Sequence, residues 1–140
     1  MSVRVLQPPS WVPPKGYSNG IVARGTLVFV GGQVGWNGAQ QFESDDFVAQ
    51  ARQALANVVA VLAEAQAVPG DIVRMTWYVV DRDEYVSSYR ALGAAYRDIV
   101  GRHFPVMTAV EVSALVEPRA RVEIEATAVI PDDRAAGGGR

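Results

Sequence analysis

The stretch from Asp71 to Asp81 reads DIVRMTWYVVD and is dense in β-branched and aromatic residues, which predicts a strand over residues 72–80. Side chains alternate between the two faces of a strand. One face of this one carries Met75, Trp77 and Val79, and the other carries Thr76, Tyr78 and Val80. Helices on one side of a sheet cover only one of these faces. We therefore expect a second copy of the chain to cover the other face, since an exposed apolar face usually marks an interface.

The flanking sequence predicts two helices and four further strands. A capped, amphipathic helix begins near Ser44 and runs to Ala65, and a second apolar stripe spans residues 85–99. The β-rich runs 21–23 and 26–30 are joined by Arg24-Gly25, which predicts a β-hairpin. Two more strands are expected at 108–112 and 121–129. The order β-β-α-β-α-β-β predicts an α+β domain with two helices packed on one face of a single sheet.

The chain of 140 residues has the size of a single domain, and 49% of its residues are hydrophobic. Residues 1–15 are expected to form a proline-rich extended arm, because four prolines lie between positions 8 and 14. Residues 16–130 would form the domain. The glycine-rich residues 131–140 would form a flexible tail.

Composition excludes several classes of function. The chain has no cysteine and one histidine, which excludes disulfides, a cysteine nucleophile and clustered thiolate or imidazole metal sites. A net charge of -2 with no polybasic run argues against binding of nucleic acid through phosphate neutralisation. No segment has the pattern of a signal peptide or a membrane span, so the expected compartment is the cytoplasm.

Glu123 and Glu125 lie on one face of the last predicted strand, about 7 Å apart by strand geometry. Neighbouring carboxylates raise each other's pKa when they are buried, which makes the pair a candidate acid or base. The alternative is a solvated edge, or pairing with Arg119 or Arg121.

Four segments together resemble the RidA/YjgF/YER057c/UK114 family of reactive-intermediate deaminases. They are VFVGGQ at 28–33, QARQALANV at 50–58, DIVR at 71–74 and VEIEATAV at 122–129. The resemblance extends from about Gly16 to Val129. It implies a chorismate-mutase-like α+β fold, a homotrimer with clefts between subunits, and no metal or organic cofactor.

The resemblance also implies site residues. Members that hydrolyse 2-aminoacrylate-type enamines and imines carry a tyrosine in a Gly-Pro-Tyr segment, a carboxylate-binding arginine in a Phe-Pro-Ala-Arg segment and a water-handling glutamate. Tyr17 and Glu123 match the tyrosine and the glutamate, and we expect both to be catalytic. Met107 replaces the arginine, and a thioether cannot bind a carboxylate as a guanidinium does. The expected substrate-binding residues are Gly31, Gly32, Gln33, Trp36, Tyr89 and Met107.

The sequence leaves two functions open. The first is cofactor-independent hydrolysis of an enamine or imine other than a standard 2-imino acid. The second is a trimer that binds a small metabolite in the same cleft without turning it over. A ribonuclease, the third reading, would need a basic groove, and the pI near 5.3 argues against one. Packing roles remain the alternative for the aromatic and methionine side chains of the expected site.

Overall fold

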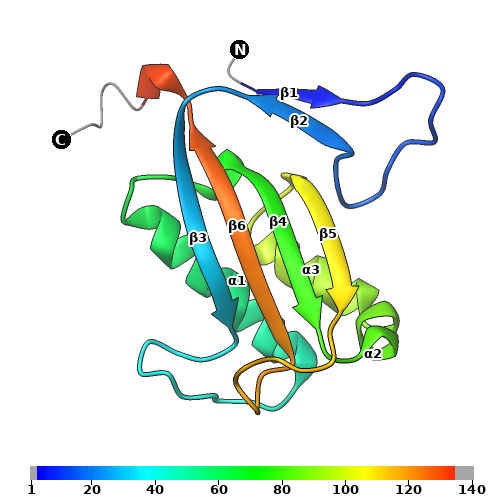
Figure 1. The fold of residues 1–140 in the computed structure, drawn as a ribbon, viewed down its shortest axis with the longest axis vertical. Helices are drawn as coiled ribbons and strands as arrows, with labels where there is room; N and C mark the ends of the chain where they lie inside the picture. Colours follow the sequence, from blue (N-terminus) through cyan, green and yellow to red (C-terminus); the bar gives the residue numbers. More distant parts are fainter. Residues whose placement is uncertain (1–2, 135–140) are drawn as a thin grey trace.

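The computed structural model describes residues 3–134, and its centre is a four-stranded sheet (Figure 1). The strands are β3 (Thr26–Val34), β4 (Ile72–Val79), β5 (Val106–Glu111) and β6 (Val122–Ile130). Their order is β3-β6-β4-β5, with β4 and β5 parallel and the other pairs antiparallel. The sheet therefore has two edges, β3 and β5.

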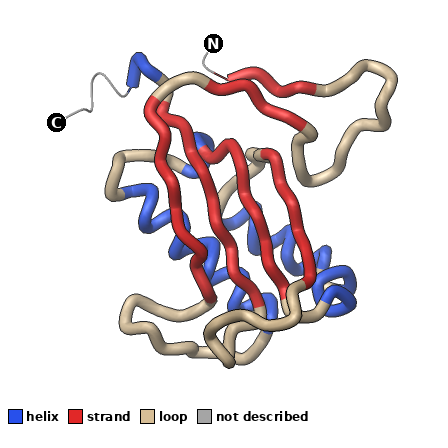
Figure 2. Tube along the Cα trace, viewed as in Figure 1, coloured by secondary structure: helices blue, strands red, loops and turns tan. Residues whose placement is uncertain are grey.

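The helices between β3 and β5 lie on one face of this sheet, as Figure 2 shows. They are α1 (Phe47–Ala63), the short 3-10 helix η1 (Pro69–Asp71), α2 (Arg82–Ser87) and α3 (Tyr89–Ile99). Asp46 caps α1 by accepting a hydrogen bond from the Ala49 amide at 2.9 Å. The core between the layers includes Leu55, Leu62, Met75, Trp77 and Ile124, all nearly inaccessible to solvent. The predicted α+β class, with helices on one face, is confirmed.

The predicted hairpin between residues 21–23 and 26–30 is wrong. β2 (Gly20–Ala23) pairs instead with β1 (Val3–Leu6), a strand that the sequence analysis assigned to the extended arm. β3 pairs with β6. Gly25, with φ at +148°, carries the chain from the small sheet to the large one, and a Cβ there would collide with the Ile130 carbonyl.

The predicted second helix is two helices. Ser88 has φ at -102° and ψ at 10°, so its backbone is not α-helical, and it separates α2 from α3. Asp81 caps α2 by accepting a hydrogen bond from the Glu84 amide at 3.1 Å. The break places Tyr85 and Tyr89 on different helices, yet their rings stay in edge-to-face contact at 5.4 Å.

The predicted tail begins with residues that are tied to the domain. Arg134 forms a salt bridge with the buried carboxylate of Asp71, and the rest of the predicted tail, residues 135–140, lies outside the described residues. Within residues 3–134, no helix is both long and apolar enough to cross a lipid bilayer.

The sheet face opposite the helices carries large apolar side chains. Leu27 and Phe29 on β3 are 56% and 72% exposed, and Val110 on β5 is 43% exposed. On β6 the buried residues Val122 and Ile124 alternate with Glu123, which places Glu123 on this open face. The expectation that another subunit covers this face stays a prediction.

Candidate functional site

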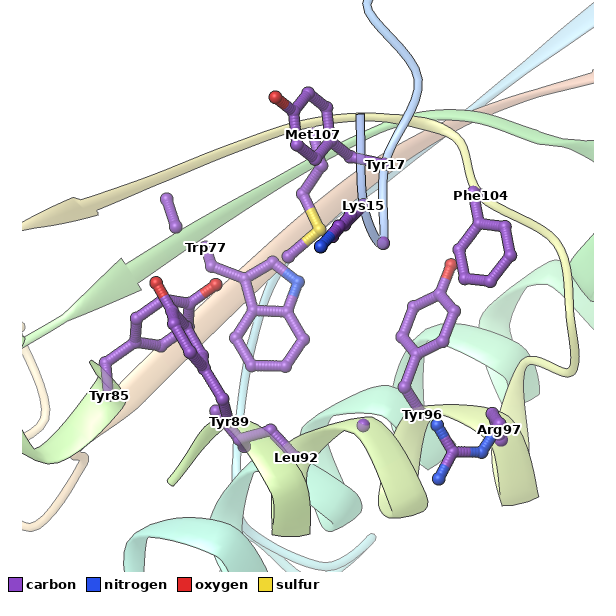
Figure 3. A pocket seen from close by; sticks show the side chains of 13 residues that line it. Lys15, Tyr17, Trp77, Tyr85, Tyr89, Leu92, Tyr96, Arg97, Phe104 and Met107 are labelled. Atoms are coloured by element: carbon purple, nitrogen blue, oxygen red, sulfur yellow. The ribbon is translucent and has the colours of Figure 1, made fainter. Parts of the chain in front are cut away.

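A pocket of about 710 Å³ lies between the β4–β5 edge of the sheet and α3, on the helix side (Figure 3). Three of the sequence-predicted residues line it: Tyr17, Tyr89 and Met107. The other large side chains around it are aromatic or cationic apart from Leu92, and they come from β4, α2, α3 and the loops at its rim: Lys15, Trp77, Tyr85, Leu92, Tyr96, Arg97 and Phe104. The pocket is therefore aromatic, with positive charge at its rim.

Ser18 holds Tyr17 against the edge of the sheet. The Ser18 amide donates to the Pro105 carbonyl at 3.1 Å, and the Ser18 hydroxyl donates to the Phe104 carbonyl at 2.6 Å. Ser18 also forms an isolated parallel bridge with Val106, so this segment continues the sheet beyond β5. These bonds bring Tyr17 to the strand that carries Met107.

Aromatic contacts order the walls of the pocket. Trp77 and Tyr85 meet edge to face at 6.1 Å, and the rings of Tyr96 and Phe104 stack at 6.4 Å with planes 9° apart. Burial and the neighbouring Tyr89 raise the pKa of Tyr85, and burial raises the pKa of Tyr96. Both groups are therefore uncharged phenols at neutral pH.

His103 closes the far end of this wall rather than offering a base. Its Nε2 lies 2.6 Å from the Ile72 carbonyl oxygen, and its own carbonyl accepts a hydrogen bond from the Tyr96 hydroxyl at 2.7 Å. The ring joins the loop before β5 to the start of β4.

Glu123 and Glu125 have different surroundings on the open face. Tyr78 donates a hydrogen bond from its hydroxyl to the Glu125 carboxylate at 2.8 Å, and this bond raises the pKa of Tyr78. Glu123 has no hydrogen-bond or salt-bridge partner among residues 3–134. The carboxylate of Glu123 is thus the member of the pair that is free to interact with another molecule.

Gly31 and Gly32 form an irregularity in β3, where the register with β6 shifts between Val30 and Gln33. A Cβ on Gly32 would overlap the Glu123 carboxylate, so glycine leaves room for that side chain. Gln33 donates from its side chain to the Gly31 carbonyl at 3.2 Å. These residues and Glu123 form one group at the β3 edge.

Trp36 lies in a third place. It packs against Phe42 at 5.7 Å and lines a shallow hollow with Phe42 and Arg119. Its position is fixed by Asn57 of α1, whose side-chain amide donates to the carbonyls of Val34 and Trp36. The predicted site residues therefore separate, within one protomer, into the pocket, the β3 edge and this hollow.

Several residues of the pocket wall were not predicted from the sequence to be site residues. Strand alternation predicts only that Trp77 shares a face with Met75 and Val79, and helical periodicity predicts only that Tyr96 belongs to the apolar stripe of residues 85–99. Lys15 ended the predicted arm and carried no motif. An alternating or helical pattern identifies buried residues but does not say which of them border a cavity.

Two residues of the helix segment 50–58, Gln50 and Asn57, have structural roles. The buried side chain of Gln50 donates to the carbonyls of Ser44 and Arg119 at 3.0 Å and accepts from the Arg121 amide at 2.8 Å. Gln50 thus ties the loop before β6 to α1, as Asn57 ties the loop after β3.

A sequence model of the Endoribonuclease L-PSP family matches residues 10–130. The chain belongs to this family, which is the RidA/YjgF/UK114 family. A RutC family protein of Haemophilus influenzae is 35% identical over 105 residues, covering 75% of this chain and 80% of that protein. The 2-iminobutanoate/2-iminopropanoate deaminase of Salmonella typhimurium is 34% identical, with the same coverage.

Solved structures of this RidA family share the fold. A Rid family protein of unknown function from Yersinia pestis has a TM-score of 0.82 at 32% identity, covering 93% of this chain and all of that one. The YjgF protein of Escherichia coli has a TM-score of 0.64 at 34% identity, covering 86% of this chain and 91% of that one. The chorismate-mutase-like fold implied by the sequence resemblance is confirmed.

Proposed function

We propose that this RidA family member hydrolyses a reactive enamine or imine metabolite in the cytoplasm, without a cofactor, in clefts between the subunits of a homotrimer. The observation that carries the proposal is the unpartnered carboxylate of Glu123, held above Gly32 while its neighbour Glu125 is bound by Tyr78. The relatives named as imine deaminases support the reaction class.

Hydrolysis of an imine requires one base and one proton donor. Water adds to the imine carbon as Glu123 takes a proton from it, and the nitrogen receives a proton, which gives a carbinolamine. Glu123 then returns its proton to the nitrogen and takes up the hydroxyl proton as the carbon–nitrogen bond breaks, so that a carbonyl compound and ammonia are released. Tyr17 lies at the rim of the pocket, with its hydroxyl directed away from Trp77 (Figure 3), and this phenol would donate a hydrogen bond to the substrate nitrogen.

Glu123 and the pocket lie apart within one protomer, and a trimer would bring them together. Glu123 lies on the open face, whereas Met107 and Trp77 face the helix side, so one chain alone does not bring the base to the pocket. Packing the open face of one subunit against the β5 edge of the next would bring Gly31, Gly32 and Glu123 to the rim of the neighbour's pocket. The exposed Leu27 and Phe29 support this contact, because burying them removes apolar surface from water.

The substrate differs from a standard 2-imino acid in this proposal. Met107 lines the pocket at the position where the resembling sequences carry arginine, and it offers no charge to a carboxylate beside the imine carbon. A 2-iminopropanoate-sized molecule would also fill little of a pocket of about 710 Å³.

Ammonia release from a panel of enzymatically generated imines tests the proposal. Glu123→Gln should lower turnover by about a hundredfold to ten-thousandfold, the usual loss when a general base is removed. Glu125→Gln is the matched control, because glutamine still accepts the Tyr78 hydrogen bond, and its rate should stay close to wild type. Equal losses in the two variants, or none in Glu123→Gln, would remove Glu123 from the mechanism.

The second candidate is a trimer that binds a metabolite without turning it over. The separation of Glu123 from the pocket within one protomer favours it. Ligand binding by calorimetry together with no ammonia release from any imine of the panel would select this function over hydrolysis.

A further inference from the structure

The indole nitrogen of Trp77 has no hydrogen-bond acceptor in the part of the chain that the structure describes. Trp77 is 2% exposed, and its Nε1 is buried without a hydrogen-bond partner among the described residues. Its ring is nevertheless part of the pocket wall, and Figure 3 shows it at the centre, with the nitrogen side directed toward Met107 and Lys15. Buried polar groups in folded proteins are nearly always paired. The position therefore suits a ligand that brings an acceptor atom.

The charge around the pocket also favours a ligand that carries an acceptor atom. Lys15 and Arg97 line it, and no aspartate or glutamate among residues 3–134 does. Within residues 3–134, neither cation forms a salt bridge, whereas six other arginines do. Figure 3 shows the Lys15 ammonium reaching in from above, near the Met107 side chain. An anionic acceptor thus meets one neutral donor and one cation at the same part of the pocket.

The rest of the wall suits a flat, apolar group. Tyr85 and Tyr89 stand on one side of Trp77, and Tyr96 and Phe104 stand on the other, as Figure 3 shows. Aromatic side chains favour offset or edge-to-face contact with another ring. The volume of about 710 Å³ has room for such a ring together with a short acidic side chain.

We propose that the pocket selects an aromatic carboxylate, with a carboxylate oxygen accepting the Trp77 Nε1 proton and facing Lys15, and with the ring against Tyr85 and Tyr89. This inference rests on the proposed function for the use of the pocket as the substrate cleft, and it names the substrate class. The acid group is recognised by Trp77 and Lys15 instead of by an arginine at position 107.

Binding is measured by titration calorimetry with 3-phenylpropanoate as the probe. Two comparison compounds separate its features: 3-phenylpropanamide lacks the charge, and 3-cyclohexylpropanoate lacks the aromatic ring. Wild type should bind the probe at least tenfold more tightly than either. Lys15→Gln should weaken binding of the acid severalfold and leave the amide unchanged. No binding of the probe at 10 mM, or equal affinity for all three compounds, overturns the inference.

A separate experiment, by NMR, tests whether the Trp77 indole donates a hydrogen bond to the ligand. Protein labelled with nitrogen-15 gives indole N–H signals for Trp11, Trp36 and Trp77, and single phenylalanine substitutions of Trp11 and Trp36 assign the third by elimination, without disturbing the core. Saturation with 3-phenylpropanoate should shift the Trp77 signal downfield, as a new hydrogen bond does, and shift the other two by much less. Binding that leaves the Trp77 signal in place overturns the assignment of Trp77 as the acceptor-binding group.

These measurements can contradict this inference without contradicting the proposed function, and the reverse also holds. Binding and the indole shift need no turnover, so an active enzyme that ignores the probe contradicts only this inference. A protein that binds the probe as described and releases no ammonia from any imine contradicts only the proposed hydrolysis.

Discussion

Replacing Gly32 with alanine tests whether this glycine exists to make room for Glu123. The new Cβ would overlap the carboxylate, and it would lie 2.8 Å from Cδ and 3.0 Å from Cγ of Glu123. Real Cβ contacts are not that short, so the outer part of the Glu123 side chain has to move. Gly31→Ala is the matched control, because a Cβ at Gly31 meets no atom within 4 Å.

Two opposing terms set the expected stability of Gly32→Ala. Forcing Glu123 away from its preferred rotamer costs about 0.5–1.5 kcal/mol. Alanine in place of glycine inside a strand contributes about 0.5–1 kcal/mol in the other direction, since the unfolded chain has less freedom to lose. The net change in the free energy of unfolding should lie within about 1 kcal/mol of zero. Turnover should still fall about as far as in Glu123→Gln.

A double-mutant cycle separates the two terms. Urea unfolding is measured for wild type, Gly32→Ala, Glu123→Ala and the double variant, with Gly31→Ala beside them. In the Glu123→Ala background the obstacle is gone, so Gly32→Ala should stabilise the protein by about the 0.5–1 kcal/mol expected for Gly31→Ala. If Gly32→Ala has the same effect in both backgrounds, the reasoning is refuted, because the cost then lies in the backbone.

Four further outcomes are expected. Light scattering should give three times the 15.1 kDa of the chain, and a monodisperse monomer at micromolar concentration would contradict the proposed trimer. Met107→Arg should raise activity on 2-iminopropanoate; a wild type already as active as its deaminase relatives would contradict the assignment of Met107. Gln50→Leu should lose about 3 kcal/mol in urea unfolding, because it leaves the Arg121 amide and two carbonyls unpaired. The raised pKa of Tyr85 and Tyr96 predicts a contribution to stability that is fully present below about pH 9 and is lost above about pH 10, where the unfolded phenols ionise first; stability that does not fall between about pH 9 and pH 11 would contradict it.

Strand alternation predicted the sheet well where one face is buried. Buried side chains alternate with more exposed ones from Met75 to Val79 in β4 and from Val122 to Ala128 in β6, as the sequence pattern indicates for Met75, Trp77 and Ile124. The hairpin failed because turn chemistry at Arg24-Gly25 is local, whereas the partner of β2 is the four-residue strand β1, across a proline-rich loop. The break at Ser88 was missed because Tyr85 and Tyr89 keep a helical spacing on either side of it.

The candidate site was predicted in parts. Tyr17, Tyr89 and Met107 come from separate segments, yet they line one pocket, and the resemblance supplied all three. Trp77 could not be recognised as a pocket residue, because the pattern that buries an indole ring says nothing of the edge that carries its N–H. Lys15 depends on how residues 16–18 dock against β5, a long-range contact that no local pattern encodes.

The position of the positive charge links the two proposals. An arginine at position 107 would stand on β5, beside Met75 on β4 in the parallel register, and so would be fixed by the sheet. Lys15 instead belongs to the segment that Ser18 ties to the Phe104 and Pro105 carbonyls, outside the regular strands. If Lys15 carries the acid recognition, loosening that segment with Ser18→Ala should weaken binding of 3-phenylpropanoate more than binding of its amide. If the charge were instead on β5, as with an arginine at position 107, Ser18→Ala would leave the difference in affinity between 3-phenylpropanoate and its amide unchanged.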